Sequence, residues 1–117
     1  MRKVYHLSSC TTCQRILKGL PQRDTFTEID IKVNSIAAKD LDIAAKASGS
    51  YEAVFSKRAM KYRGQGLHEQ QLSEDDFRRL ILEEYTFLKR PVFFVDDHIF
   101  VGNSKKVVAA LYEYLQS

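Results

Sequence analysis

Two cysteines three positions apart, Cys10 and Cys13, are the residues in this sequence best suited to chemistry, and the chain has no other cysteine. A thiolate can act as a nucleophile, a redox group or a metal ligand, so the pair is compatible with a redox couple, a metal site or a structural disulfide. Two cysteines at helical spacing can also be small buried residues.

A metal site and a structural disulfide are the weaker interpretations. Zinc needs three or four ligands, and beyond the cysteines the chain offers only His6, His68 and His98, with no second CxxC and no HxxxH motif. A disulfide within a CxxC motif closes a minimal loop and stabilises little. We therefore expect no metal.

The cysteines lie where a strand predicted over residues 3–7 passes into a predicted helix. Ser9 or Thr11 is the expected cap of this helix, and Gly19 with Pro21 is expected to end it. The apolar positions follow i, i+3, i+4, i+7 spacing: Cys13, Ile16, Leu17 and Leu20. Burial as an ordinary core residue therefore suits Cys13 better than Cys10.

The start of a helix favours a thiolate at Cys10. The first backbone N–H groups of a helix have no partner within it, and the helix dipole places partial positive charge there. Both effects lower the pKa of a thiol below its free value of about 8.5. Arg15 and Lys18 add positive charge nearby. We interpret Cys10 as the nucleophile and Cys13, one turn further on, as the resolving thiol.

The remaining elements follow from local patterns. Residues 25–32 are strand-rich, and a helix capped by Ser73 with Asp76 lies further on. Residues 35–70 between them are largely helical, with "YEAVFSKRAMKY" over residues 51–62 as one helical stretch. Two short strands in "RPVFFVDDHIFVGN" are joined by Asp96-Asp97-His98 as a tight antiparallel hairpin, and a last helix begins at Asn103 or Ser104.

This order predicts an α/β fold of the thioredoxin-like kind. A strand, a helix and a strand within about thirty residues imply a parallel pair with a right-handed crossover. The sheet is then four-stranded, mixed and flanked by helices, with a helical insert over roughly residues 35–70 between the βαβ and ββα halves. We expect one domain over residues 1–117, since this length suits a single core.

Pro91 and Arg90 indicate a second part of the site. In thioredoxin-like domains the strand that faces the active-site loop begins after a cis-proline, and Pro91 stands at the start of such a strand. We predict a cis Arg90–Pro91 bond, which would place Arg90 beside Cys10 to stabilise a thiolate or hold an oxyanion. A solvated arginine at a strand edge is the alternative.

Arg58 and His6 are weaker candidates from the sequence alone. Arg58 in "FSKRAMKY" resembles a surface residue of an Ala-rich helix, and neighbouring basic residues look the same by composition. His6 at the end of the first strand could hydrogen-bond the Cys10 loop, although a lone histidine is more often structural.

Composition excludes several functional classes. The net charge of +3 is mild and no run of Lys or Arg resembles a basic tail, so we expect no direct nucleic-acid binding. The start "MRKVYHLSS" is too short in apolar residues for a signal peptide, and no stretch approaches a membrane span. We expect a cytoplasmic monomer with no membrane contact, in a reducing compartment where a close cysteine pair is typically catalytic, redox-sensing or metal-binding and not a permanent disulfide.

Taken together, the motifs resemble those of the arsenate reductase/Spx family of thioredoxin-like proteins over nearly the whole chain. The matching pieces are "SSCTTCQR", "FSKRAMKY", "SEDDFRRLILEEY", "LKRPVFFVDD" and "IFVGNSKKVVAAL". Glutaredoxin-linked arsenate reductases of the family show HxxxCxxxR, and here His6 and Cys10 match while Gln14 stands at the arginine position. They generally lack the second cysteine.

The resemblance also implies oxyanion-binding residues. Of three further arginines in those reductases, Arg58 and Arg90 occupy the first two positions, and the third, near Gly102, is absent. Spx-type regulators carry a CxxC motif, an Arg-x-x-x-Tyr, an Arg-Pro and a Val-Gly. The corresponding residues here are Cys10, Cys13, Arg58, Tyr62, Arg90, Pro91, Val101 and Gly102.

Two functions therefore follow from the resemblance. The first is a thiol–disulfide oxidoreductase of arsenate-reductase type, which acts on a small oxyanion or on a protein or glutathione disulfide. It would bind no cofactor and would draw electrons from glutathione with glutaredoxin, or from thioredoxin. The second is a redox-sensing transcriptional regulator of Spx type that binds the α-subunit of RNA polymerase through a Cys10–Cys13 disulfide switch.

Overall fold

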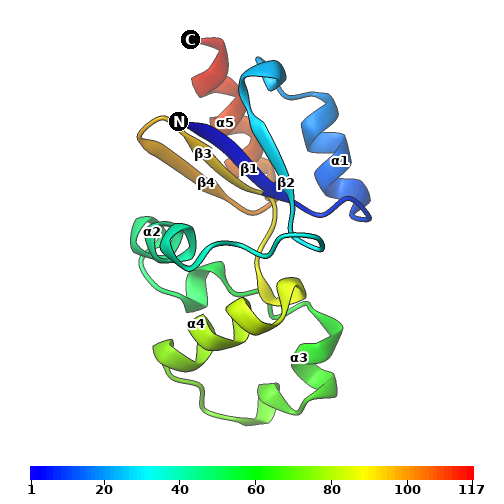
Figure 1. Cartoon of the computed structure of the whole chain (residues 1–117), viewed down its shortest axis with the longest axis vertical. Coiled ribbons are helices and arrows are strands. Elements are labelled where there is room, and N and C mark those ends of the chain that lie inside the picture. The colour runs from blue at the N-terminus through cyan, green and yellow to red at the C-terminus, as the bar shows by residue number, and fades with distance from the viewer. The chain divides into compact units, whose positions relative to one another are not determined.

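A computed structural model describes all residues, Met1–Ser117, and divides them into two compact units (Figure 1). The sheet unit comprises Met1–Asn34 and Arg90–Ser117, and the helical unit comprises Ser35–Lys89. The inserted unit thus extends past residue 70 and includes the helix that follows. No helix has both the length and the apolar character that crossing a membrane would require.

The sheet unit contains a four-stranded mixed sheet in the order β2-β1-β3-β4. Strands β1 (Arg2–His6) and β2 (Thr27–Asp30) pair in parallel, while β3 (Val92–Val95) pairs antiparallel with both β1 and β4 (His98–Val101). The predicted thioredoxin-like sheet, its parallel pair and its antiparallel hairpin are confirmed, except that His98 belongs to β4 and the turn consists of Asp96 and Asp97 alone.

The core of the sheet unit lies between one face of the sheet and two helices, α1 (Thr11–Lys18) and α5 (Lys105–Gln116) (Figure 1). Val4 pairs with Phe93, so alternation along the strands places both side chains on the face that these helices cover. The other buried members of this cluster are Ile16, Leu17, Leu20, Phe26, Val95, Leu111 and Leu115.

The N-cap of the first helix lies between the two residues that were predicted for it. Cys10, and neither Ser9 nor Thr11, is the N-cap residue of α1, with extended backbone angles of φ −90° and ψ 110°. The N–H of Cys10 donates to the Leu7 carbonyl at 3.0 Å, and this turn places a sulfur where a hydroxyl was expected. At the start of α5 the predicted cap is confirmed, because Ser104 Oγ accepts the Val107 N–H at 3.2 Å.

The helical unit contains three α-helices: α2 (Ala38–Ser48), α3 (Met60–Gly64) and α4 (Glu74–Glu83). Helix α4 begins with the predicted capping box, in which Ser73 and Asp76 each accept a backbone N–H of the other. Short 3-10 turns complete the chain: η1 (Arg23–Thr25) in the sheet unit, and η2 (Glu52–Val54), η3 (Leu67–Glu69) and η4 (Tyr85–Phe87) in the helical unit.

The expectation that residues 51–62 form one continuous helical stretch is wrong. Phe55 is buried and forms an isolated antiparallel bridge with Leu88. Its ring lies 4.9 Å from that of Phe77 and 5.0 Å from that of Phe87. Burying this aromatic ring draws the chain out of the helix, so Arg58 lies exposed in a turn before α3 and not on a helix.

Candidate active site

The Cys10 sulfur lies over the start of α1. Its Sγ accepts the backbone N–H of Cys13 at 3.4 Å, which satisfies one of the unpaired donors of the first helical turn. Cys10 is partly exposed, so a substrate atom can approach the sulfur. This is the geometry expected of a thiolate held by a helix N-terminus.

Three influences set the pKa of Cys10. Partial burial alone would raise this pKa, but the N–H and side chain of Cys13 and the positive charge and hydrogen bond of Arg90 outweigh burial. The pKa of Cys10 therefore lies below its ordinary value. A larger fraction of this thiol is ionised at neutral pH than in an unfolded chain.

Cys13 has the opposite character. Its side chain is 0% exposed, and burial, followed by its contact with the Cys10 sulfur, raises its pKa to about 12 although a hydrogen bond involving Leu7 lowers it. Both cysteines are free thiols in the structure. The pair thus combines an accessible, acidic thiol with a buried one that stays protonated at neutral pH.

Arg90 and Pro91 lie at the start of β3, next to the cysteine loop. The Arg90–Pro91 peptide bond is cis, as predicted, and Arg90 acts on Cys10 by charge and by hydrogen bonding. The Pro91 carbonyl accepts the N–H of Gly102 at 2.9 Å, which ties this turn to the end of β4. The sheet unit therefore brings Arg90 to the Cys10 sulfur.

Gln14 connects His6 to the cysteine loop, a role that the sequence did not indicate. Its Nε2 donates to His6 Nδ1 at 3.2 Å and to the Leu7 carbonyl at 3.0 Å. The Leu7 carbonyl also accepts the N–H of Cys10, so Gln14 holds the turn that positions Cys10.

The sequence offered one indication that Gln14 belongs to the site, its position four residues after Cys10. Gln14 occupies the position where an arginine is expected, and a neutral amide there cannot supply positive charge to an anion. In this structure the amide is engaged with the loop itself.

Arg58 belongs to the helical unit, and its role in binding an oxyanion stays a prediction. It is exposed, and the lysines on either side form ion pairs within that unit, Lys57 with Glu52 at 2.5 Å and Lys61 with Glu84 at 2.6 Å. The structure contains no group of three or more His, Cys, Asp or Glu side chains that could hold a metal ion.

The sheet topology and the paired thiols at a helix N-terminus define a thiol-based redox protein of thioredoxin-like fold. The model of the ArsC family matches residues 5–111, and the chain belongs to this family.

Individual relatives cover most of the chain. It is 24% identical over 102 residues to the global transcriptional regulator Spx 2 of Bacillus anthracis. This match covers 85% of this chain and 77% of that protein. A "possible arsenate reductase" from Streptococcus mutans is 28% identical with a TM-score of 0.76, and the match covers 100% of this chain and 98% of that one. The arsenate reductase from Vibrio cholerae, 19% identical with a TM-score of 0.74 over 94% of this chain and 96% of that one, shares the fold.

Proposed function

We propose that the protein is a thiol–disulfide oxidoreductase in which Cys10 is the nucleophile and Cys13 the resolving thiol. The observation that supports this most directly is the contrast between the two thiols. Cys10 has a lowered pKa beside Arg90, whereas Cys13 is buried and has a pKa of about 12. The Cys10 thiol is thus more readily ionised and able to attack, whereas the Cys13 thiol is protonated at neutral pH.

The proposed cycle transfers two electrons. The Cys10 thiolate attacks a sulfur of a disulfide or the central atom of an oxyanion and displaces a thiolate or a hydroxide. The Cys13 thiol then loses its proton and attacks the Cys10 sulfur. This step forms the Cys10–Cys13 disulfide, releases the reduced substrate and oxidises the two cysteines.

Arg90 supplies the electrostatic part of the proposed chemistry. A guanidinium that contacts the Cys10 sulfur is also placed to neutralise an anion that reacts there. We assign Arg58 to the same anion, and His6 and Pro91 to shaping the site, by their match to the family pattern. In the proposed cytoplasmic setting, glutathione with glutaredoxin, or thioredoxin, would return the disulfide to two thiols.

Arsenate is the first oxyanion to test, because solved structures related to this chain are described as arsenate reductases. Purified protein would be given arsenate, glutathione, glutaredoxin and glutathione reductase, and NADPH consumption would be followed, with Cys10→Ser as the control. Turnover that requires Cys10 supports the reductase. Absence of turnover, in protein whose Cys10 still reacts with a thiol probe, refutes arsenate as the substrate.

A second candidate is a redox switch of Spx type. It is favoured by the similarity to a transcriptional regulator over 85% of the chain and by the second cysteine. In this case the Cys10–Cys13 disulfide would change the start of α1, and the output would be binding to the RNA polymerase α-subunit.

Binding to the isolated C-terminal domain of that subunit separates the two candidates. Calorimetry would compare reduced and oxidised protein, with Cys13→Ser as the variant that cannot form the disulfide. The switch is supported if oxidation changes the affinity of the native protein for this domain and oxidant leaves the affinity of Cys13→Ser unchanged. Equal binding, or none, in both redox states contradicts it.

A further inference from the structure

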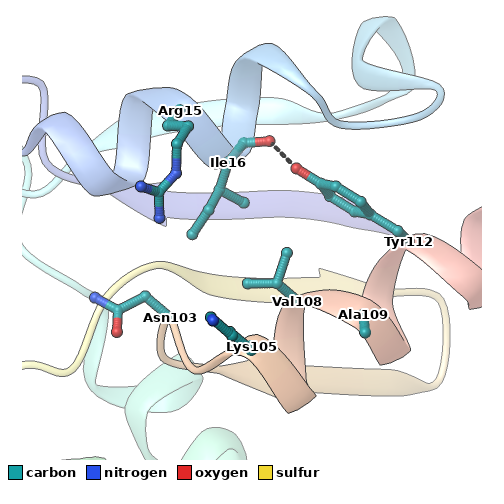
Figure 2. Close-up of a pocket in the computed structure, with 7 residues that line it drawn as sticks. All are labelled: Arg15, Ile16, Asn103, Lys105, Val108, Ala109 and Tyr112. Atoms are coloured by element: carbon teal, nitrogen blue, oxygen red, sulfur yellow. Dashed lines mark hydrogen bonds between the residues drawn. The ribbon is translucent and has the colours of Figure 1, made fainter.

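A hollow of about 390 Å³ lies between α1 and α5 in the sheet unit (Figure 2). The hydroxyl of Tyr112 donates to the Ile16 carbonyl at 2.6 Å and joins the two helices at one end of it. The lining combines apolar, amide and cationic side chains and contains no carboxylate: Arg15, Ile16, Asn103, Lys105, Val108, Ala109 and Tyr112.

The two cations of the hollow, Arg15 and Lys105, have no ion-pair partner in the structure. Exposed cations elsewhere, such as Lys18 and Lys39, are unpaired as well, but they line no hollow, and the distinguishing feature of Arg15 and Lys105 is that both line this one. Figure 2 shows the guanidinium of Arg15, on α1, and the ammonium of Lys105, on α5, at the same hollow. Two unpaired cations from different helices thus line the same hollow, whose surface also includes the apolar side chains of Ile16 and Val108.

Lys105 also stands where a cation is electrostatically unfavourable. It is the first residue of α5, whose first turn contains no acidic residue. The positive end of the helix dipole favours anions at this position and disfavours lysine. Departures from such local preferences are expected at functional sites. An anion bound in the hollow would reduce the repulsion between Lys105 and the positive end of the α5 dipole.

We propose that the hollow between α1 and α5 binds a small organic anion with an apolar body. The carboxylate or sulfonate of such a ligand lies between Arg15 and Lys105, and its apolar body packs on Ile16 and Val108. The volume falls within the range of about 300–1,000 Å³ of small-molecule sites. The ligand contacts neither Cys10 nor Arg90, so this site is additional to the proposed redox activity.

Anilinonaphthalene sulfonate is a suitable probe, because it carries one anionic group on an apolar body and fluoresces when bound. Reduced protein would be titrated with the dye, and bound dye would then be displaced with octanoate or with octylammonium, which has a similar apolar chain and the opposite charge. We expect saturation at one dye per chain and displacement by octanoate but not by octylammonium.

Three variants test the assignment to the hollow. The double variant Arg15→Gln/Lys105→Gln should weaken dye binding about tenfold or more, as expected when hydrogen bonds to charged groups are lost. Ala109→Glu, an exposed change in the lining, should abolish binding by repulsion while α5 stays helical by circular dichroism. The matched control Lys18→Gln/Lys39→Gln removes two exposed cations elsewhere and should leave binding unchanged.

The proposal is overturned if the native protein shows no saturable binding, if the Arg15/Lys105 double variant or Ala109→Glu binds as the native protein does, or if octylammonium competes as well as octanoate. Because the readout is binding by reduced protein, failure here leaves the redox proposal untouched. Loss of turnover in the redox assay likewise does not affect this test.

Discussion

Replacing Arg90 by methionine tests the account of what lowers the pKa of Cys10. The change removes the positive charge and the hydrogen bond that act on the Cys10 sulfur and keeps an unbranched apolar side chain. Partial burial raises the pKa of Cys10, and in the variant only the contacts with Cys13 still counteract this effect. We expect the pKa of Cys10 to rise in Arg90→Met.

The size of the effect follows from the strength of one charged contact. A hydrogen bond to a charged group is worth about 1.5–3 kcal/mol, which corresponds to about a ten- to hundredfold change in thiolate fraction at a pH below the pKa. A thiolate of higher pKa is more nucleophilic, with a Brønsted coefficient of about 0.4–0.5, and this returns about half of the loss on a logarithmic scale. Alkylation of Cys10 at neutral pH should therefore slow by about three- to tenfold.

The assay is the rate of iodoacetamide modification as a function of pH, with the modified cysteine identified by mass spectrometry. Arg90→Lys keeps the charge and should recover part of the rate, whereas Lys46→Gln, which removes an exposed cation of α2, should have no effect. An Arg90→Met protein with the native rate and the native pH midpoint would refute the reasoning.

Three other predictions concern stability, each measured by urea denaturation of the reduced protein. Folding raises the pKa of Cys13 to about 12, so its contribution to stability is fully present below the pKa of a free thiol and is lost as pH rises from there towards 12. Cys13→Ala should flatten this alkaline loss, and an unchanged pH profile would contradict the assignment. Gln14→Leu removes the hydrogen bonds to His6 and to the Leu7 carbonyl. It should lower the free energy of unfolding by about 1–3 kcal/mol, because the buried Nδ1 of His6 loses its donor, although the Leu7 carbonyl still accepts the Cys10 N–H; a change below about 0.5 kcal/mol would argue against its role in holding the turn. Ser73→Ala removes the cap of α4 and should cost about 1 kcal/mol, whereas Ser73→Asp, which can still cap, should cost less; equal losses in the two variants would show that the cap is not responsible.

Much of the fold could be predicted because the relevant signals are local. β-branched and aromatic residues marked the strands, and the parallel β1–β2 pair followed from their short separation through one helix. The course of residues 51–62 could not be predicted in the same way. Phe55 leaves a helical pattern because it packs against rings more than twenty positions away in the sequence, and no local pattern carries that information.

The candidate site shows the same division. The special position of Cys10 followed from the physics of a helix start, and the placement of Arg90 followed from the cis-proline strand. The cap itself was misassigned, since hydroxyl residues on both sides of Cys10 have the higher intrinsic preference. The contacts of Gln14 and the hollow between α1 and α5 depend on side chains that meet only after folding.

The central claim is that Cys10 attacks and Cys13 resolves, and trapping the adduct tests it most directly. Reduced native protein and Cys13→Ser would each be mixed with glutathione disulfide, quenched with acid and mapped by mass spectrometry without reduction. We predict a stable glutathione adduct on Cys10 in Cys13→Ser, and a Cys10–Cys13 disulfide with no lasting adduct in the native protein. An adduct that persists equally in both proteins, or one that forms on Cys13, would contradict the account.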